Sequence, residues 1–296
     1  MRVPLTVTAK DEERALGACL DSLLASARFA ERALAKDGVD LAFEPLVVCD
    51  DCADGTARVA ESRGVPVVAS SGGKVAAQRA GHRAVGEGFE VFSDADLFVE
   101  EPALLQLVRA MRSDPALRVA VPRKRPIAPA RRGPIARALY VYNAHDGFAA
   151  PRAWFSGKLF AIRGWYVPEG LRVDDVWLSR AIDPERVRAV DGAVVWFRPP
   201  ETARGAYRYY RRLRRAFEEC DALFPETRAR HVRRRTDPER LARAPRSDRA
   251  AFRVFEAMIA AFRVTYAAER AYHRGRTWDP WTPIEETKAP IDPRGG

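Results

Sequence analysis

Short apolar runs alternate with helical stretches through the first 121 residues, and this alternation constrains the fold more than any other feature. In the stretches between the runs, apolar residues recur at helical spacing, as Leu16, Leu20, Leu23 and Leu24 do. Strands are expected at 3–8, 46–49, 65–69, 89–92 and 117–121, and helices at 11–27, 55–63, 75–85 and 102–111. Later in the chain, two further short strands are expected within 187–197. Such alternation predicts an α/β domain, with a mostly parallel sheet flanked by helices.

Acidic residues follow three of the predicted strands. In chain order they are Asp11 and Glu12, Asp50 and Asp51, and Asp94 and Asp96. Because ligands of parallel sheets bind at the carboxyl ends of the strands, we expect these side chains to share one ligand-binding edge. Asp94 and Asp96 are two residues apart, so together they can hold a divalent cation beside a ribose or a diphosphate. Such hard oxygen ligands suit Mg²⁺ or Mn²⁺.

An Asp-x-Asp pattern by itself is more often a solvated turn than a metal site. Its neighbours favour the metal site here. Asp50 closes an earlier strand, Lys74 lies in a glycine-rich turn, and a further acidic pair, Asp174 and Asp175, follows later in the chain. We therefore interpret the acidic strand ends as parts of one site.

A series of segments carries more specific information because of its order and spacing. The segments are 7–13, 19–23, 47–57, 73–81, 92–96, 155–162 and 174–178. Together they resemble the motifs of family 2 glycosyltransferases, which use nucleotide-sugars and have the GT-A (Rossmann-like) fold. The resemblance spans roughly residues 1–200. It implies an inverting transfer of a sugar from a nucleoside-diphosphate-sugar to an acceptor hydroxyl.

The resemblance also implies which residues bind the donor. Thr8, Lys10 and Glu12 match the positions that line the base and the ribose, and Asp50 matches the position that binds the base. Lys74, at the start of the helix before the Asp-x-Asp strand, is assigned to the same nucleotide-sugar site.

The reaction centre is implied in the same way. Asp94 would approach the ribose, Asp96 would ligate Mg²⁺ or Mn²⁺ on the diphosphate, and Asp175 would be the general base. Asp174 stands where the family carries Glu, so either aspartate of the pair could be the base, and we favour Asp175. Arg79 replaces a usual Asn. The motif of processive members is absent, which favours transfer of a single sugar.

Two other functions fit parts of the sequence. A sugar nucleotidylyltransferase shares the general architecture, but it usually has a glycine-rich basic loop after the first strand, where this chain has Thr-Ala-Lys-Asp-Glu-Glu. A non-enzymatic nucleic-acid binder could use the basic C-terminal part. Such a protein has no use for the aspartates, and no RNP, zinc-finger or clear helix-turn-helix motif is visible. We therefore expect no nucleic-acid partner.

The positive charge is concentrated in the C-terminal part. Between residues 204 and 276 there are 20 Arg and 9 acidic residues, a net of +11, whereas the whole chain nets +10. This part is helical in pattern, with Phe252, Phe255, Ile259, Phe262 and Tyr266 on one face. The aromatic face is expected to pack on the first domain, to pack in a homodimer, or to lie on an anionic membrane surface.

The expected domains follow from these patterns. They are a catalytic domain at 1–200, an Arg-rich helical extension at 201–288 with a turn at 278–281, and a disordered tail at 289–296. The chain has no apolar run long enough to cross a bilayer and no signal-peptide pattern at its N-terminus. We expect a cytoplasmic protein, with the inner face of the cytoplasmic membrane as a possible location. The acceptor stays open, a lipid-linked or cell-envelope molecule being one option.

Overall fold

The computed structural model describes residues 1–83, 88–149, 155, 157–230, 236–273, 284–291 and 293. The strands are β1 (Arg2–Ala9), β2 (Ala42–Asp50), β3 (Val67–Ser70), β4 (Glu90–Asp94), β5 (Leu97–Val99), β6 (Val119–Pro126), β7 (Leu159–Ile162) and β8 (Val187–Phe197). The α-helices are α1 (Leu16–Lys36), α2 (Thr56–Glu61), α3 (Lys74–Gly81), α4 (Ala103–Ser113), α5 (Pro134–Ala144), α6 (Asp174–Ala181), α7 (Ala203–Leu223), α8 (Pro238–Arg243) and α9 (Arg246–Tyr272).

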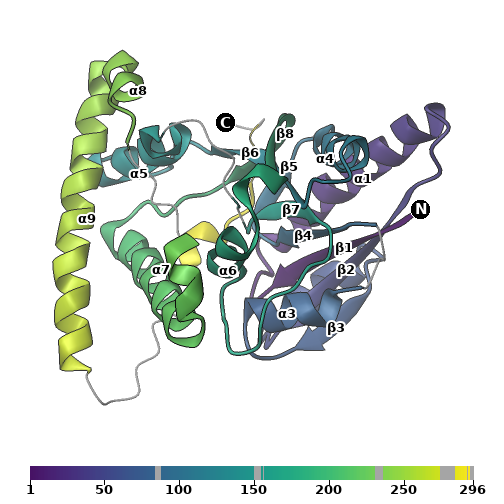
Figure 1. Ribbon diagram of the computed structural model, residues 1–296, viewed down its shortest axis with the longest axis horizontal. Coiled ribbons are helices and arrows are strands. Elements are labelled where there is room, and N and C mark those ends of the chain that lie inside the picture. The colour runs from purple at the N-terminus through teal and green to yellow at the C-terminus, as the bar shows by residue number, and fades with distance from the viewer. Residues whose placement is uncertain are drawn as a thin grey trace.

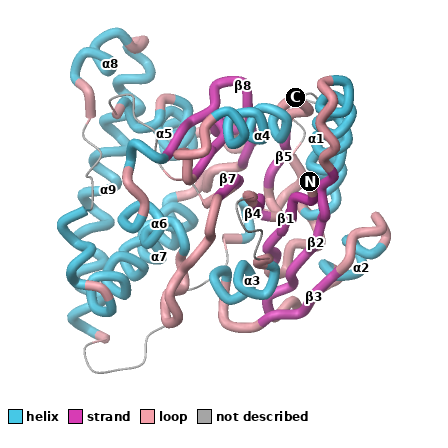
Figure 2. Tube along the Cα trace, turned by 45° about the vertical axis from the view of Figure 1, so that its right-hand side comes forward, coloured by secondary structure: helices cyan, strands magenta, loops and turns pink. Residues whose placement is uncertain are grey.

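The described strands form one sheet in the order β3-β2-β1-β4-β7-β6-β8-β5 (Figure 1). The first four strands in this order are parallel, which confirms the expected α/β architecture. The other half is mixed, because β7 runs antiparallel to both of its neighbours and β5 runs antiparallel to β8. Figure 2 shows the strands side by side with helices packed around them.

The structure differs from the sequence prediction at two strands. Residues 187–197 were expected as two short strands and form the single strand β8. The strand carries a bulge at residues 191–193, because β6 pairs Pro122 with Val190 and Arg123 with Val194. The short strand β5 was not expected. It follows the Asp-x-Asp segment directly and pairs only with β8, from far along the chain.

Both faces of the sheet are buried. In β7, Leu159 and Ala161 face the core formed with α1 and α4, whereas Phe160 and Ile162 face the core formed with α6 and α7. This alternation follows from the two-residue period of a strand. Since α7 lies in the extension, its residues Ala216 and Cys220 join the extension to the second core.

The aromatic face of the extension packs inside the protein. Phe262 lies with its ring centre 5.1 Å from that of Tyr207 in α7, and Phe255 stacks on Tyr142 of α5 at 3.9 Å. Tyr266 is also buried. Of the three expected arrangements, packing on the domain is the one in the structure, and a membrane contact through Phe255, Phe262 and Tyr266 was the wrong expectation.

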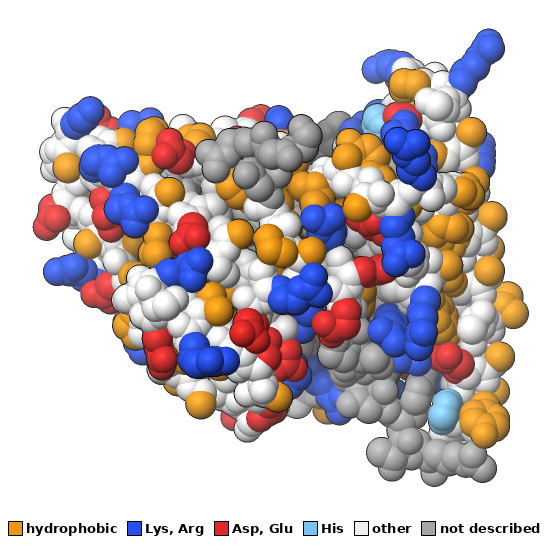
Figure 3. Space-filling model, turned by 180° about the vertical axis from the view of Figure 1, so that it is seen from behind, with side chains coloured by type: hydrophobic (Ala, Val, Ile, Leu, Met, Phe, Trp, Pro, Cys, Tyr) orange, Lys and Arg blue, Asp and Glu red, His pale blue; other side chains and the backbone are white. Residues whose placement is uncertain are grey.

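The outer side of the extension carries basic residues beside small apolar ones. Figure 3 shows Lys and Arg side chains over the right-hand part of the molecule, next to the apolar edge of α9. Among the described residues, no helix combines the length and the hydropathy that a membrane crossing requires. The expected turn at 278–281 and half of the expected tail, residues 292 and 294–296, lie outside the described residues. In the described half of the tail, Ile291 is buried.

Replacing Phe262 by alanine is expected to lower the free energy of unfolding by roughly 3–5 kcal/mol, because a buried ring is removed and leaves a cavity. Phe262 is 8% exposed and contacts two tyrosines of α7. Chemical denaturation of both proteins measures the change. Val264→Ala on the same helix is the matched control, since Val264 is 72% exposed and its loss should change stability little. Equal stability of the two variants would contradict the packed arrangement.

Candidate active site

The ends of three parallel strands bring the predicted acidic residues together. In the pairing of β1 with β4, Thr8 lies opposite Asp94, and in the pairing of β1 with β2, Ala9 lies opposite Cys49, just before Asp50. Asp50 and Asp94 therefore end strands on either side of β1. The predicted convergence at one edge of the sheet is present in the structure.

Asp50 is buried and held from two sides. Its Oδ1 accepts a hydrogen bond from the backbone N–H of Gly73 at 2.9 Å, and its Oδ2 lies 3.7 Å from Nζ of Lys10. Gly73 has a φ of +93°, in the region that favours glycine, and immediately precedes α3. The glycine-rich turn thus fixes the carboxylate and leaves the half-exposed Lys10 beside it.

Lys74 connects the Asp-x-Asp segment to the second acidic pair. Its Nζ lies 2.7 Å from Oδ1 of Asp94 and 3.5 Å from Oδ1 of Asp174, and it donates to the carbonyl of Gly157 at 2.6 Å. Burial lowers the pKa of Lys74, but the two carboxylates raise it by more, so that the pKa lies above its ordinary value. The side chain is therefore a fixed positive charge.

Asp94 and Asp96 share a second lysine. Nζ of Lys158 lies 3.7 Å from Oδ2 of Asp94 and 3.7 Å from Oδ1 of Asp96. Two carboxylates turned toward one cation are the hard oxygen ligands that Mg²⁺ and Mn²⁺ accept, so the residues present fit the expected divalent ion. Lys158 belongs to a segment noted in the sequence, but the sequence did not assign it a role.

The two aspartates at the start of α6 differ in their surroundings. Asp174 is 1% exposed, and its Oδ2 accepts a hydrogen bond from Nε2 of Gln78 at 2.7 Å. Asp175 keeps a buried Oδ1 that has no hydrogen-bond partner among the described residues. Burial and the charge of Asp174 raise the pKa of Asp175 to about 6, against the lowering effects of Lys74 and Arg212. Asp174 is thus hydrogen-bonded through Oδ2, whereas the pKa of Asp175 lies above its ordinary value.

Helix α7 contributes residues that the sequence did not predict for the site. The guanidinium of Arg212 lies 5.5 Å from the ring centre of Tyr209. Tyr209 is 47% exposed. Desolvation by the surrounding atoms and the charge of Asp175 raise its pKa, while Arg212 and Lys158 lower it. Both side chains therefore lie within electrostatic range of Asp175.

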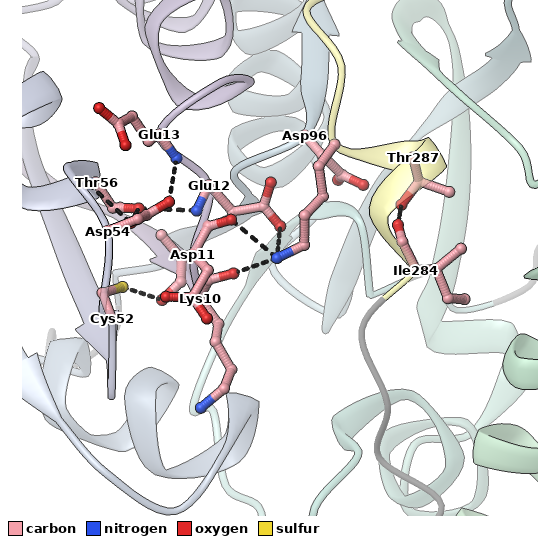
Figure 4. Close-up of polar contacts among 12 residues, drawn as sticks. Lys10, Asp11, Glu12, Glu13, Cys52, Asp54, Thr56, Asp96, Ile284 and Thr287 are labelled. Carbon is pink, nitrogen blue, oxygen red and sulfur yellow. Dashed lines mark hydrogen bonds and ion pairs between the residues drawn. The ribbon is translucent and has the colours of Figure 1, made fainter.

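Glu12 and its neighbours form the turn that leaves β1 (Figure 4). The backbone N–H of Glu12 donates to Oγ1 of Thr56 at 2.8 Å, and Oε1 of Glu12 lies 3.7 Å from Nζ of Lys288. Burial and the charge of Asp96 raise the pKa of Glu12 to about 8, whereas Lys288 lowers it. Lys288 was not predicted as a site residue.

One signal in the sequence could have revealed Lys158 and Lys288. The chain has 50 basic residues, of which only six are lysine and 44 are arginine. Four of the six lysines contact the predicted site residues. They are Lys10, Lys74, Lys158 and Lys288. An ammonium group is compact and fits between carboxylates where a planar guanidinium needs more room.

Comparison with known proteins gives one family. The family model described as Glycosyl transferase family 2 matches residues 5–164. None of the curated proteins compared with the chain matches it.

Three solved structures are among those similar to the chain. Mannosyltransferase PcManGT from Pyrobaculum calidifontis, in complex with GDP-Man and Mn²⁺, is 18% identical with a TM-score of 0.48, over 97% of this chain and 85% of that one. S. aureus TarS 1–349 is 17% identical with a TM-score of 0.44, over 75% of this chain and 66% of that one. Glucosyl-3-phosphoglycerate synthase from Mycobacterium tuberculosis is 17% identical with a TM-score of 0.42, over 66% and 71%. In a further TarS structure, with UDP-GlcNAc, the match spans 36% of that chain.

Proposed function

The chain belongs to glycosyl transferase family 2, and on this premise we propose that it moves one sugar from a nucleoside-diphosphate-sugar to an acceptor hydroxyl with inversion. The observation that carries the proposal is that Lys74 pairs with both Asp94 and Asp174, while the neighbouring Gly73 fixes Asp50 at the end of the next strand but one. Family membership also sets aside the nucleotidylyltransferase alternative.

The donor is proposed to bind across the ends of β1 and β2. Asp50, fixed by Gly73, accepts hydrogen bonds from the base, and Lys10 lies beside it. Thr8 and Glu12 line the base and the ribose. Glu12 supports this assignment because its Oε2 is buried without a hydrogen-bond partner among the described residues. A buried carboxylate oxygen without a partner is costly, and a ribose hydroxyl would satisfy it.

The diphosphate is proposed to lie over the Asp-x-Asp segment. Asp96, with Asp94 nearby, would hold Mg²⁺ or Mn²⁺, which when bound neutralises charge that develops on the leaving nucleoside diphosphate. Lys74 and Lys158 place two further positive charges at the same carboxylates. These fixed charges stabilise the same developing charge without having to reorganise.

Asp175 is proposed to act as the general base. The acceptor oxygen forms a bond to the anomeric carbon, while the bond from that carbon to the diphosphate oxygen breaks. The hydroxyl proton goes to Asp175, and the nucleoside diphosphate leaves with the electron pair. The free Oδ1 of Asp175 supports this role, whereas Asp174 is tied to Gln78 and Lys74. Because the acceptor attacks opposite the leaving group, the anomeric centre inverts.

The acceptor is proposed to bind between α6 and α7. Two side chains of α7 interact electrostatically with Asp175. The charge of Arg212 lowers the pKa of Asp175, and the charge of Asp175 raises the pKa of Tyr209. An arginine and a tyrosine offer hydrogen-bond donors to an oxygen-rich acceptor.

Nucleotide-sugars are expected to raise the melting temperature, because a ligand that binds only the native state stabilises it. A panel of UDP-, GDP- and dTDP-sugars, each with and without Mn²⁺, tests this by thermal shift. At about 100 times the dissociation constant, the stabilisation is about 2.7 kcal/mol. The Asp50→Ala variant should lose the shift, since Asp50 is proposed to bind the base. If no donor shifts the wild-type protein under any condition, the proposed function is wrong.

A further inference from the structure

The C-terminal segment 284–291 places a lysine in the turn that leaves β1. Nζ of Lys288 donates to the carbonyl of Lys10 at 2.7 Å and to the carbonyl of Asp11 at 2.9 Å. It also lies 3.7 Å from Oε1 of Glu12. Lys288 is 8% exposed, so its charge is buried among these three acceptors. Because a buried charge is costly unless it is paired and hydrogen-bonded, these three partners compensate for the burial of the ammonium.

The segment is held on both sides of Lys288. The carboxylate of Glu286 accepts hydrogen bonds from the backbone N–H of Glu201 and from the hydroxyl of Thr202, the residue that caps α7. Ile284 and Ile291 are buried. The lysine therefore reaches the β1 turn from a fixed base, which limits the entropy lost in holding its long side chain.

The turn itself needs such a partner. Asp11 has a φ of +53°, a left-handed conformation that costs free energy in a residue other than glycine. Two successive carbonyls, of Lys10 and Asp11, point at the ammonium of Lys288. An ammonium has three N–H donors. Two of them bond the carbonyls, and the positive charge faces Glu12.

We propose that Lys288 is a positioning residue for the donor: it fixes the turn at residues 10–12 and holds the Glu12 carboxylate toward the ribose hydroxyls. This inference rests on the proposed function, because it needs a nucleotide in the site. The pairing of Oε1 with Lys288 leaves Oε2 buried and without a hydrogen-bond partner among the described residues. Oε2 is the oxygen that the ribose would reach.

The test measures how strongly binding depends on the ribose hydroxyls. Titration calorimetry with Mn²⁺ gives the dissociation constants of UDP and GDP and of their 2′,3′-dideoxy forms. In the wild-type protein we expect the better of the two nucleotides to bind about 10-fold more tightly than its dideoxy form, the scale of leaving one buried polar oxygen without its hydrogen bond. In Lys288→Met this gap should close, because Glu12 is no longer held. Lys36→Met, at the exposed end of α1, is the matched control and should keep the gap.

Each outcome decides between clear alternatives. A wild-type protein that binds neither UDP nor GDP overturns this inference, and one that also gives no thermal shift with dTDP-sugars overturns the proposed function with it. A Lys288→Met protein with an unchanged gap overturns the inference alone, as does equal weakening of both nucleotide forms, which indicates a merely structural role. If Lys288→Met binds the nucleotides more tightly than the wild-type protein, the inference is also wrong, because the segment then obstructs the site. If Lys288→Met does not fold, Lys288→Gln keeps N–H donors for the carbonyls but lacks the charge, and the same closing of the gap is expected.

Discussion

Replacing Asp175 by asparagine is expected to lower kcat by about 10²-fold or more, the scale of general-base removal. Asparagine keeps the shape of the side chain but cannot take the proton of the acceptor hydroxyl. Donor affinity should change little, because the donor is proposed to contact the strand ends and not Asp175. Steady-state kinetics and nucleotide titration of the same preparation separate the two quantities.

The matched variant is Asp174→Asn. Asp174 accepts from Gln78 and pairs with Lys74, so its replacement should disturb the charge balance of the site and not the proton transfer itself. An inactive Asp174→Asn protein beside an active Asp175→Asn protein would assign the base to Asp174.

The pH profile gives an independent check on Asp175. Burial and the charge of Asp174 raise its pKa to about 6. Only the ionised carboxylate accepts a proton, so kcat at saturating donor should fall as the pH drops through about 6 and should hold above it. The residual rate of Asp175→Asn should lack this acid limb.

Replacing Asp96 by alanine is expected to reduce turnover by about 10²–10³-fold, the effect of losing one group that stabilises developing charge. It should also abolish the Mn²⁺ dependence of nucleotide binding. The fold should survive, since within the described part of the chain the Asp96 carboxylate pairs with Lys158 at 3.7 Å, and such an ion pair contributes little to stability. Nucleotide titration across a range of Mn²⁺ concentrations, with melting temperature as the folding control, measures both effects.

Glu101→Ala is the matched control, because it also removes a negative charge close to Asp96 in the sequence. Glu101 is exposed, so its loss should not disturb the site. It should bind metal and nucleotide as the wild-type protein does. An Asp96→Ala protein that retains full activity, with that activity still sensitive to EDTA, would move the metal to other ligands.

The first half of the fold was predictable because local patterns determine it. The period of the apolar residues identified the parallel strands, and the register of β1 with its neighbours then brought Asp50 and Asp94 together as expected. The antiparallel strand β7 was not predictable in direction, since its pairing with β4 and β6 is set by tertiary packing over long sequence separations. Local periodicity carries no information about such pairings.

The site residues also divide into those that local patterns reveal and those that only tertiary packing brings together. Residues at strand ends, such as Asp94 and Asp96, were found from their position in the pattern. Tyr209 and Arg212 were missed because only the packing of α7 on α6 brings them beside Asp175. The extension could be recognised as helical and basic, but the choice between a packed and an exposed aromatic face depended on partners, α5 and α7, that the sequence does not reveal.

The contact between Lys288 and Lys10 joins residues that are 278 positions apart, and this separation has a kinetic meaning. The parallel strands pair over shorter sequence separations, so their pairing can form before the C-terminal segment docks on the turn after β1. The segment is attached by side-chain contacts and not by a sheet ladder, so it belongs with the parts of a protein that open before the whole molecule unfolds. We therefore expect this segment to dock last in folding and to open first in unfolding, in both cases beside the proposed donor site.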